Sequence, residues 1–160
     1  MPMPTPVRLG LFLPRPTPFY RALAAQMARG FRAAGFEVHS DTALLDEAGL
    51  VAFCRAFRPD VVFEMNRTRR DAHGLPADVR HIAWVVDFQG RRDDEIEGSD
   101  ITYMFDPLWK RVFRYDTFVD WLPPGACHET YHPGSGETAA IVADMIANMT
   151  NRSLLMMDLS

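Results

Sequence analysis

Residues 7–35 read VRLGLFLPRPTPFYRALAAQMARGFRAAG and predict a strand, a loop and a helix in that order. The mostly apolar run at 7–13 is typical of a strand, and the proline-rich turn after it stops that strand. Thr17 followed by Pro18 is the pairing of a helix N-cap with a first-turn proline. Apolar residues then recur every three or four positions, and Gly35 suits the residue after the helix. This order begins a βαβ unit.

The same alternation continues along the chain. Strands that alternate with helices give right-handed βαβ units and a mainly parallel sheet. Strands that are almost continuously apolar fit a sheet covered on both faces. We therefore expect an α/β fold: a single Rossmann-like, doubly wound domain with a mainly parallel sheet and helices on both faces. The later elements that we predict are strands at 36–40, 60–65, 80–86, 101–105 and 117–122, a helix at 44–57 and a helix that starts at Pro107.

The composition excludes several classes of protein. The 160 residues carry 17 lysines and arginines against 21 aspartates and glutamates, a net charge of −4, which argues against a basic nucleic-acid-binding protein. Two cysteines are too few for a disulfide framework. No apolar run approaches the roughly 18 residues of a membrane span, and the N-terminus lacks the apolar core of a signal peptide. We expect one cytoplasmic domain that binds neither nucleic acid nor membrane.

Polar residues follow several of the predicted strands, where ligands bind in sheets of this kind. Asp87 ends the most apolar strand, and a carboxylate beside buried strands can have a raised pKa and act as a general base. Asp and Asn also favour caps and turns, so a capping role stays open for each candidate, and Asp106 before Pro107 is also a good helix start. The other residues that follow predicted strands are Arg15, Asn66, Gln89, Asp106 and Gly125.

The common cofactor motifs are missing. No Gly-x-Gly-x-x-Gly follows the first predicted strand and no Walker A sequence occurs, so we expect no cofactor bound by those loops. Residues 128–132 read HETYH, the His-Glu-x-x-His zinc pattern of metalloproteases, which needs one continuous helix. Prolines at 123, 124 and 133 flank the pattern and break such a helix. We therefore expect no metal, and a zinc hydrolase is the last of three candidate functions.

A basic run follows the third predicted strand and contains Arg67, Arg69 and Arg70. Arginine side chains bind phosphate and sugar-phosphate groups well, because their planar fork matches the anion. We favour the interpretation of a solvated polar loop over residues 66–79, with the anion site as the alternative.

Five segments, taken in order within about residues 7–133, carry a resemblance to one family: GFEV (35–38), FRPDVVF (57–63), HIAWVVD (81–87), SDITYMFD (99–106) and WLPPGACHETYHP (121–133). They resemble the N-terminal domain of GT-B glycosyltransferases, most closely the CgeB-like (spore-maturation-protein-like) group. In that group a strand ending in Trp-x-x-Asp precedes a Ser-Asp strand, and a Leu-Pro-x-Gly/Ala turn then leads to an aromatic-x-Pro segment.

The resemblance implies a function for the domain. In GT-B enzymes the N-terminal domain binds the acceptor and often supplies the base, and the C-terminal domain binds the nucleotide-sugar. Asp87 would then be the catalytic base or a ligand of the acceptor hydroxyl. No second Rossmann unit follows residue 133, so we expect the acceptor-binding half of a nucleotide-sugar-dependent glycosyltransferase, inactive alone and without a cofactor of its own. The acceptor contacts would be Arg15, Asn66, Gln89, Asp106 and the turn at Gly125.

The expected organisation is a Rossmann-like domain at 1–133, with a C-terminal helix and apolar tail at 134–160 packed on it. The expected partners are a sugar or protein acceptor, and either a separate donor domain or a second copy of the chain. The alternative function is a non-catalytic Rossmann-like module that binds another protein. Its motivation is the missing donor domain and the apolar residues at 154–157, which suit a partner surface.

Overall fold

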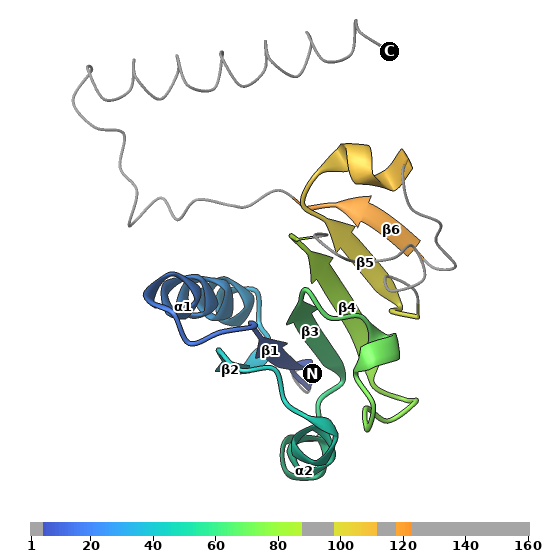
Figure 1. Ribbon diagram of the computed structural model, residues 1–160. Helices are drawn as coiled ribbons and strands as arrows, with labels where there is room; N and C mark the ends of the chain where they lie inside the picture. The colour runs from blue at the N-terminus through green and yellow to red at the C-terminus, as the bar shows by residue number, and fades with distance from the viewer. Residues whose placement is uncertain (1–4, 88–97, 112–117, 123–160) are drawn as a thin grey trace, which may run out of the picture. The chain divides into compact units, whose positions relative to one another are not determined.

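A parallel sheet organises the computed structural model, which describes residues 5–87, 98–111 and 118–122 (Figure 1). Its six strands are β1 (Arg8–Phe12), β2 (Glu37–Asp41), β3 (Val61–Met65), β4 (Arg80–Val85), β5 (Ile101–Met104) and β6 (Phe118–Trp121). They lie in the order β2-β1-β3-β4-β5-β6, and every neighbouring pair is parallel. The predicted Rossmann-like α/β class is confirmed.

The order of the strands places a topological switch point between β1 and β3. From β1 the chain first moves outward to β2, and then returns past β1 to continue on the other side as far as β6. The register puts Leu11 of β1 between Ser40 of β2 and Phe63 of β3. In doubly wound sheets the ligand crevice forms at such a point, outside the carboxyl ends of the strands.

Helices cover both faces of the sheet, as predicted (Figure 1). The α-helices are α1 (Pro18–Ala33) and α2 (Glu47–Phe57), and the short 3₁₀ helices are η1 (Arg69–Asp71) and η3 (Pro107–Arg111). Successive strand residues point to opposite faces. Leu11 therefore joins the cluster under α1, whereas Phe12 meets Phe53 of α2 with 5.0 Å between the ring centroids. Between β3 and β4 the described chain forms a loop with η1 in place of a long helix.

Side-chain caps set where the helices begin. Thr17 accepts a hydrogen bond at its Oγ1 from the Tyr20 N–H at 3.2 Å, so the predicted N-cap of α1 is confirmed. Asp46 caps α2 through its Oδ1, which accepts from the Gly49 N–H at 2.8 Å. The helix was predicted to start at residue 44, but it begins at Glu47. Asp46 is its N-cap, and an N-cap residue has an extended backbone that lies outside the helix.

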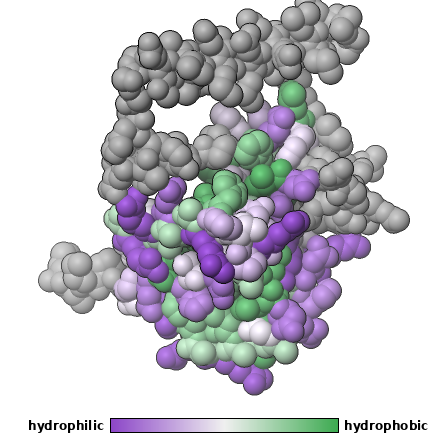
Figure 2. Space-filling model, turned by 60° about the vertical axis from the view of Figure 1, so that its left-hand side comes forward, coloured by the Kyte–Doolittle hydropathy of each residue, from purple (hydrophilic) through white to green (hydrophobic). Residues whose placement is uncertain are grey.

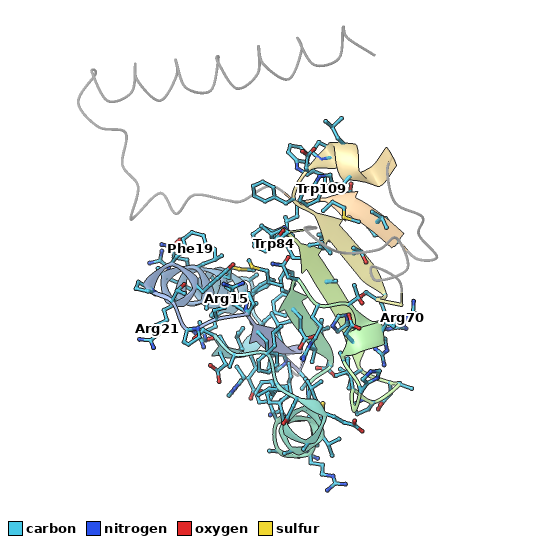
Figure 3. The ribbon with its side chains drawn as sticks, viewed as in Figure 1. Arg15, Phe19, Arg21, Arg70, Trp84 and Trp109 are labelled. Carbon is cyan, nitrogen blue, oxygen red and sulfur yellow. The ribbon has the colours of Figure 1, made fainter. Side chains whose placement is uncertain are left out.

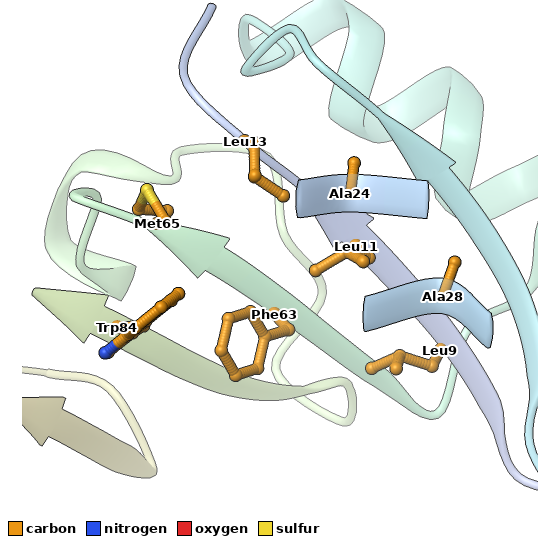
Figure 4. Close-up of a cluster of buried hydrophobic side chains, with 8 residues drawn as sticks. All are labelled: Leu9, Leu11, Leu13, Ala24, Ala28, Phe63, Met65 and Trp84. Carbon is orange, nitrogen blue, oxygen red and sulfur yellow. The ribbon is translucent and has the colours of Figure 1, made fainter. Parts of the chain in front are cut away.

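The larger buried cluster lies between α1 and the sheet (Figure 4). Ala24 and Ala28 are the buried residues of α1, and these small side chains let the helix backbone come close to the strands. Each leucine buried there contributes about 1.5–3 kcal/mol to folding. The cluster consists of Leu9, Leu11, Leu13, Ala24, Ala28, Phe63, Met65 and Trp84.

The outer surface is mixed in character. Figure 2, turned so that the side of the molecule with α1 comes forward, shows hydrophilic residues over that face with hydrophobic residues between them. Among the described helices, none is long and apolar enough to cross a membrane. All described residues belong to a unit of the chain that runs to Pro124. The helix and tail predicted at 134–160 lie outside the described residues and stay predictions.

A glycine in β1 lets α2 approach the sheet. A Cβ added to Gly10 would lie 2.8 Å from two ring carbons of Phe53. That ring cannot move aside cheaply, because it packs against Phe12, His39 and Phe57 with centroid distances of 5.0, 5.1 and 5.2 Å. Gly10 is therefore required for packing at this contact.

We expect Gly10→Ala to lower the free energy of unfolding by about 1–3 kcal/mol, because overpacking forces a buried ring off its preferred position. Urea denaturation of the full chain measures this change. The matched control is Gly30→Ala in α1, where nothing lies within 4 Å of the added Cβ. The control should raise stability by about 0.5–1 kcal/mol, as alanine does in a helix. Equal shifts in the two variants would contradict the packing argument.

Candidate functional site

The predicted site residues that the structure describes lie at the carboxyl edge of the sheet. Arg15 follows β1, Asn66 follows β3, Asp87 follows β4 and Asp106 follows β5. Figure 3 shows Arg15 near the start of α1 and Trp84 near the end of β4, at the same edge. Because β1 and β3 flank the switch point, this edge is where the topology expects a ligand.

Asn66 joins the ends of β3 and β4. Its backbone is left-handed, with φ of 60°, and its N–H donates to the Trp84 carbonyl at 2.9 Å. Its side-chain Oδ1 accepts hydrogen bonds from the N–H groups of Val86 at 2.8 Å and Asp87 at 3.0 Å. The amide oxygen of Asn66 therefore holds the turn. Of the two roles considered for Asn66, ligand binding and capping of a turn, the structure shows the second.

Asp87 lies beside Asn66, in an environment that differs from the predicted one. Its backbone N–H is bound by Asn66 Oδ1, so the main chain at this position is held. Its side chain is exposed, whereas the prediction placed it against buried strands. Exposure gives the carboxylate no apolar enclosure.

The remaining candidates differ from one another. Asp106 Oδ1 accepts a hydrogen bond from the Leu108 N–H at 2.8 Å, which is the capping role foreseen for it, at the start of η3. Arg15 is exposed, and within the described part of the chain it makes no hydrogen bond or ion pair. Gln89 and Gly125 lie outside the described residues. The part of each in ligand binding stays a prediction.

A buried charge pair stands behind this edge, and the sequence interpretation missed it. Glu64 of β3 has no exposed surface, and Arg67 donates to both of its carboxylate oxygens, with Nε 2.7 Å from Oε2. Arg67 Nη1 also donates to the Leu45 carbonyl at 2.6 Å. Arg67 is therefore not part of a solvated basic run. The available signal was a glutamate inside an apolar strand, because a buried charge needs a partner.

Two further buried side chains extend the pair. His81 Nε2 lies 3.1 Å from Glu64 Oε2, and His81 Nδ1 lies 3.0 Å from Ser99 Oγ. The Ser99 oxygen also accepts from the Arg69 N–H at 3.1 Å. A neutral imidazole with its proton on Nε2 satisfies every one of these contacts, because Nδ1 then accepts the serine proton.

The chain of serine, histidine and glutamate is similar in kind to a hydrolase triad. The Ser99, His81 and Glu64 side chains are all fully buried, however, and Glu64 is neutralised by Arg67. No substrate reaches the serine oxygen, so the network serves to hold β3, β4 and the residues before β5 together. It fills the space under the loop that connects β3 with β4.

The basic loop is tied to the protein at a second arginine. Arg69 Nη1 donates to the Val79 carbonyl and Arg69 Nη2 to the Pro76 carbonyl, both at 2.7 Å. The solvated loop predicted at 66–79 is therefore wrong for Arg67 and Arg69, because their guanidinium groups close the loop on itself and on the sheet. The same contacts argue against the anion site, since these forks already have acceptors.

The pKa of Glu64 follows from its surroundings. Burial by itself raises the pKa of this carboxyl. The hydrogen bonds from His81 and Arg67 and the charge of Arg67 lower it by more than burial raises it, so the pKa lies below the ordinary value of 4.5. Asp100 behaves in the same way: burial raises its pKa, and the His81 N–H, Arg80 and Arg69 together lower it. Both carboxylates are ionised in the folded protein under neutral conditions.

Comparison with known proteins adds no assignment. No protein-family model matches the chain, and no curated protein matches it. Within the described residues, no group of three or more His, Cys, Asp or Glu side chains is placed to hold a metal ion. The HETYH segment at 128–132 lies outside those residues.

Because the pKa of Glu64 is lower in the folded than in the unfolded chain, the stability it provides is complete above pH 4.5 and is lost as the pH falls through the folded value. We expect Glu64→Gln to lower the free energy of unfolding at pH 7 by about 3–5 kcal/mol, since Arg67 is left uncompensated. The variant should also lose part of the decline in stability below pH 4.5. Urea denaturation over a pH series measures both effects.

The matched control is Glu37→Gln, which removes an exposed ion pair with Arg8 at 3.2 Å. At pH 7 its free energy of unfolding should stay within about 0.5 kcal/mol of wild type. If Glu64→Gln were as mild as the control, the buried pair would not contribute as argued.

Proposed function

We propose that this domain is the acceptor-binding half of a nucleotide-sugar-dependent glycosyltransferase of the GT-B type. The observation that carries the proposal is the placement of the two motif segments on adjacent parallel strands. HIAWVVD contains most of β4 and ends two residues after it at Asp87, and SDITYMFD contains β5 and ends two residues after it at Asp106. Two aspartates of the motifs therefore follow neighbouring strands at one edge, and Asp87 is bound there by Asn66.

The proposed chemistry uses Asp87 as the base. Asp87 is exposed, so that an acceptor hydroxyl can approach it from solvent, and its main chain is held by Asn66. As the acceptor oxygen bonds to the anomeric carbon of the donor sugar, Asp87 takes the hydroxyl proton. The bond from that carbon to the diphosphate breaks, and the nucleoside diphosphate leaves with the electron pair. The donor belongs to a second domain, and Arg15 contacts the acceptor across the switch point.

A non-catalytic interaction module is the second candidate, and one observation favours it. Phe118 and Trp121 of β6 are 58% and 48% exposed, which is unusual for large apolar side chains at the edge of a sheet. Sedimentation of the full chain separates the candidates. A stable dimer that binds no glycan would favour the module, and a glycan-binding monomer the glycosyltransferase half.

We expect the full chain to bind a subset of a glycan array and to bind none of a panel of nucleoside-diphosphate sugars. Asp87→Asn should weaken glycan binding by about 10- to 100-fold, because it removes a charged hydrogen-bond acceptor. Titration calorimetry with the strongest array glycan measures the change, and circular dichroism verifies the fold.

Asp78→Asn is the control, since Asp78 is an exposed aspartate before the start of β4, at the opposite edge of the sheet. It should bind the glycan as wild type does. Equal binding by Asp87→Asn and wild type would remove Asp87 from the site, and an array without any bound glycan would contradict the acceptor role.

A further inference from the structure

We propose that Arg67 and Glu64 are positioning residues for the carboxyl edge. Their buried ion pair holds the left-handed turn at Asn66, and through that turn it sets the backbone at Val86 and Asp87. The inference rests on the proposed function only in treating Asp87 as a ligand-binding group. Its test measures hydrogen exchange of the chain without a bound glycan. A failure of this inference and a failure of the proposed function therefore give different results.

The ion pair fixes the chain on both sides of Asn66. Glu64 belongs to β3, and Arg67 reaches back over three residues to bind both of its carboxylate oxygens. The Arg67 guanidinium also holds the Leu45 carbonyl at 2.6 Å, which attaches it to the segment before α2. With its two ends held in this way, the chain between Glu64 and Arg67 has to turn sharply at the edge of the sheet.

The turn places Asn66 in the left-handed region. Its φ is 60°, a conformation that costs most residues with a side chain about 1–2 kcal/mol and that asparagine tolerates better, because its short amide can hydrogen-bond locally. Such a conformation persists only where the surrounding contacts determine it. In this conformation Asn66 Oδ1 accepts hydrogen bonds from the N–H groups of Val86 at 2.8 Å and Asp87 at 3.0 Å.

The pair cannot shift without moving other elements. His81 Nε2 holds Glu64 Oε2 from β4 at 3.1 Å, and Ser99 holds the same ring from the approach to β5. The charged and titratable groups around the pair therefore come from β3, β4, the loop after β3 and the residues before β5. Among them, Asp100 accepts a hydrogen bond from the His81 N–H and forms an ion pair with Arg69. The position of Asp87 depends on this buried network, although none of its members lies at the edge.

Hydrogen exchange measured by NMR on the ¹⁵N-labelled full chain tests the inference. In Arg67→Gln we expect the amides of Val86 and Asp87 to exchange at least about tenfold faster than in wild type, because their acceptor is no longer held. The Leu13 amide is the internal reference, since Leu13 is buried and its N–H bonds to the Asp41 carbonyl at 3.1 Å, beside β1 and β2 and apart from the Val86 and Asp87 backbone. A loss of overall stability would accelerate all three amides together.

Two variants separate the route from a general effect. Asn66→Gly keeps the left-handed backbone and removes Oδ1, so it should accelerate the same two amides. Arg80→Gln removes an ion pair with Asp100, 2.7 Å long, at the other end of β4, and should leave both amides unchanged. Arg67→Lys keeps the charge and should restore part of the protection; it is also the variant to read if Arg67→Gln does not fold.

The inference is overturned if Val86 and Asp87 keep their exchange rates relative to Leu13 in Arg67→Gln, or in Arg67→Lys where that is the folded variant. Selective acceleration together with an empty glycan array would support the positioning role and reject the proposed function. Unchanged exchange together with glycan binding would do the reverse.

Discussion

A carboxylate enclosed in the sheet is the constraint on which the rest of this structure depends. Glu64 has no exposed surface, so its charge must be matched where it stands. Arg67 supplies that match from the loop after β3, and His81 and Ser99 complete the hydrogen bonds. The loop between β3 and β4 is held against the sheet because this charge requires it to be there.

The two faces of the sheet are held in different ways. Under α1 the contacts are apolar and small alanines of the helix fit between larger strand residues. On the other face α2 covers only part of the sheet through an aromatic cluster around Phe53, and Gly10 gives that ring its space. Beyond α2 the polar network lies under the loop, and a smaller apolar cluster of Ala83, Val85 and Met104 packs against Trp109 of η3. This division leaves the carboxyl edge to polar residues.

Much of the fold was predictable, and the reasons are local. The strand at 7–13, the cap at Thr17 and the alternation of elements all follow from short-range patterns, and the parallel sheet follows from the alternation. The start of α2 was predicted too early, because several polar residues before the helix could serve as its N-cap and the sequence does not show that Asp46 is the one. At the candidate site, the proximity of Asn66 and Asp87 was predictable from strand order, whereas the exposure of Asp87 and the capping by Asp106 depend on packing around them.

By itself the sequence determined the α/β class, the Thr17 cap of α1 and the residues that follow each strand, because these depend on neighbours along the chain. Only the tertiary structure decided that Arg67 and Arg69 face inward. The spacing of these arginines along the chain is typical of a solvated loop. The neighbouring sequence does not indicate that Glu64, His81 and Ser99 meet beneath that loop. The physical reason is that the cost of a buried charge is met by partners from several elements, which come together only when the sheet is assembled.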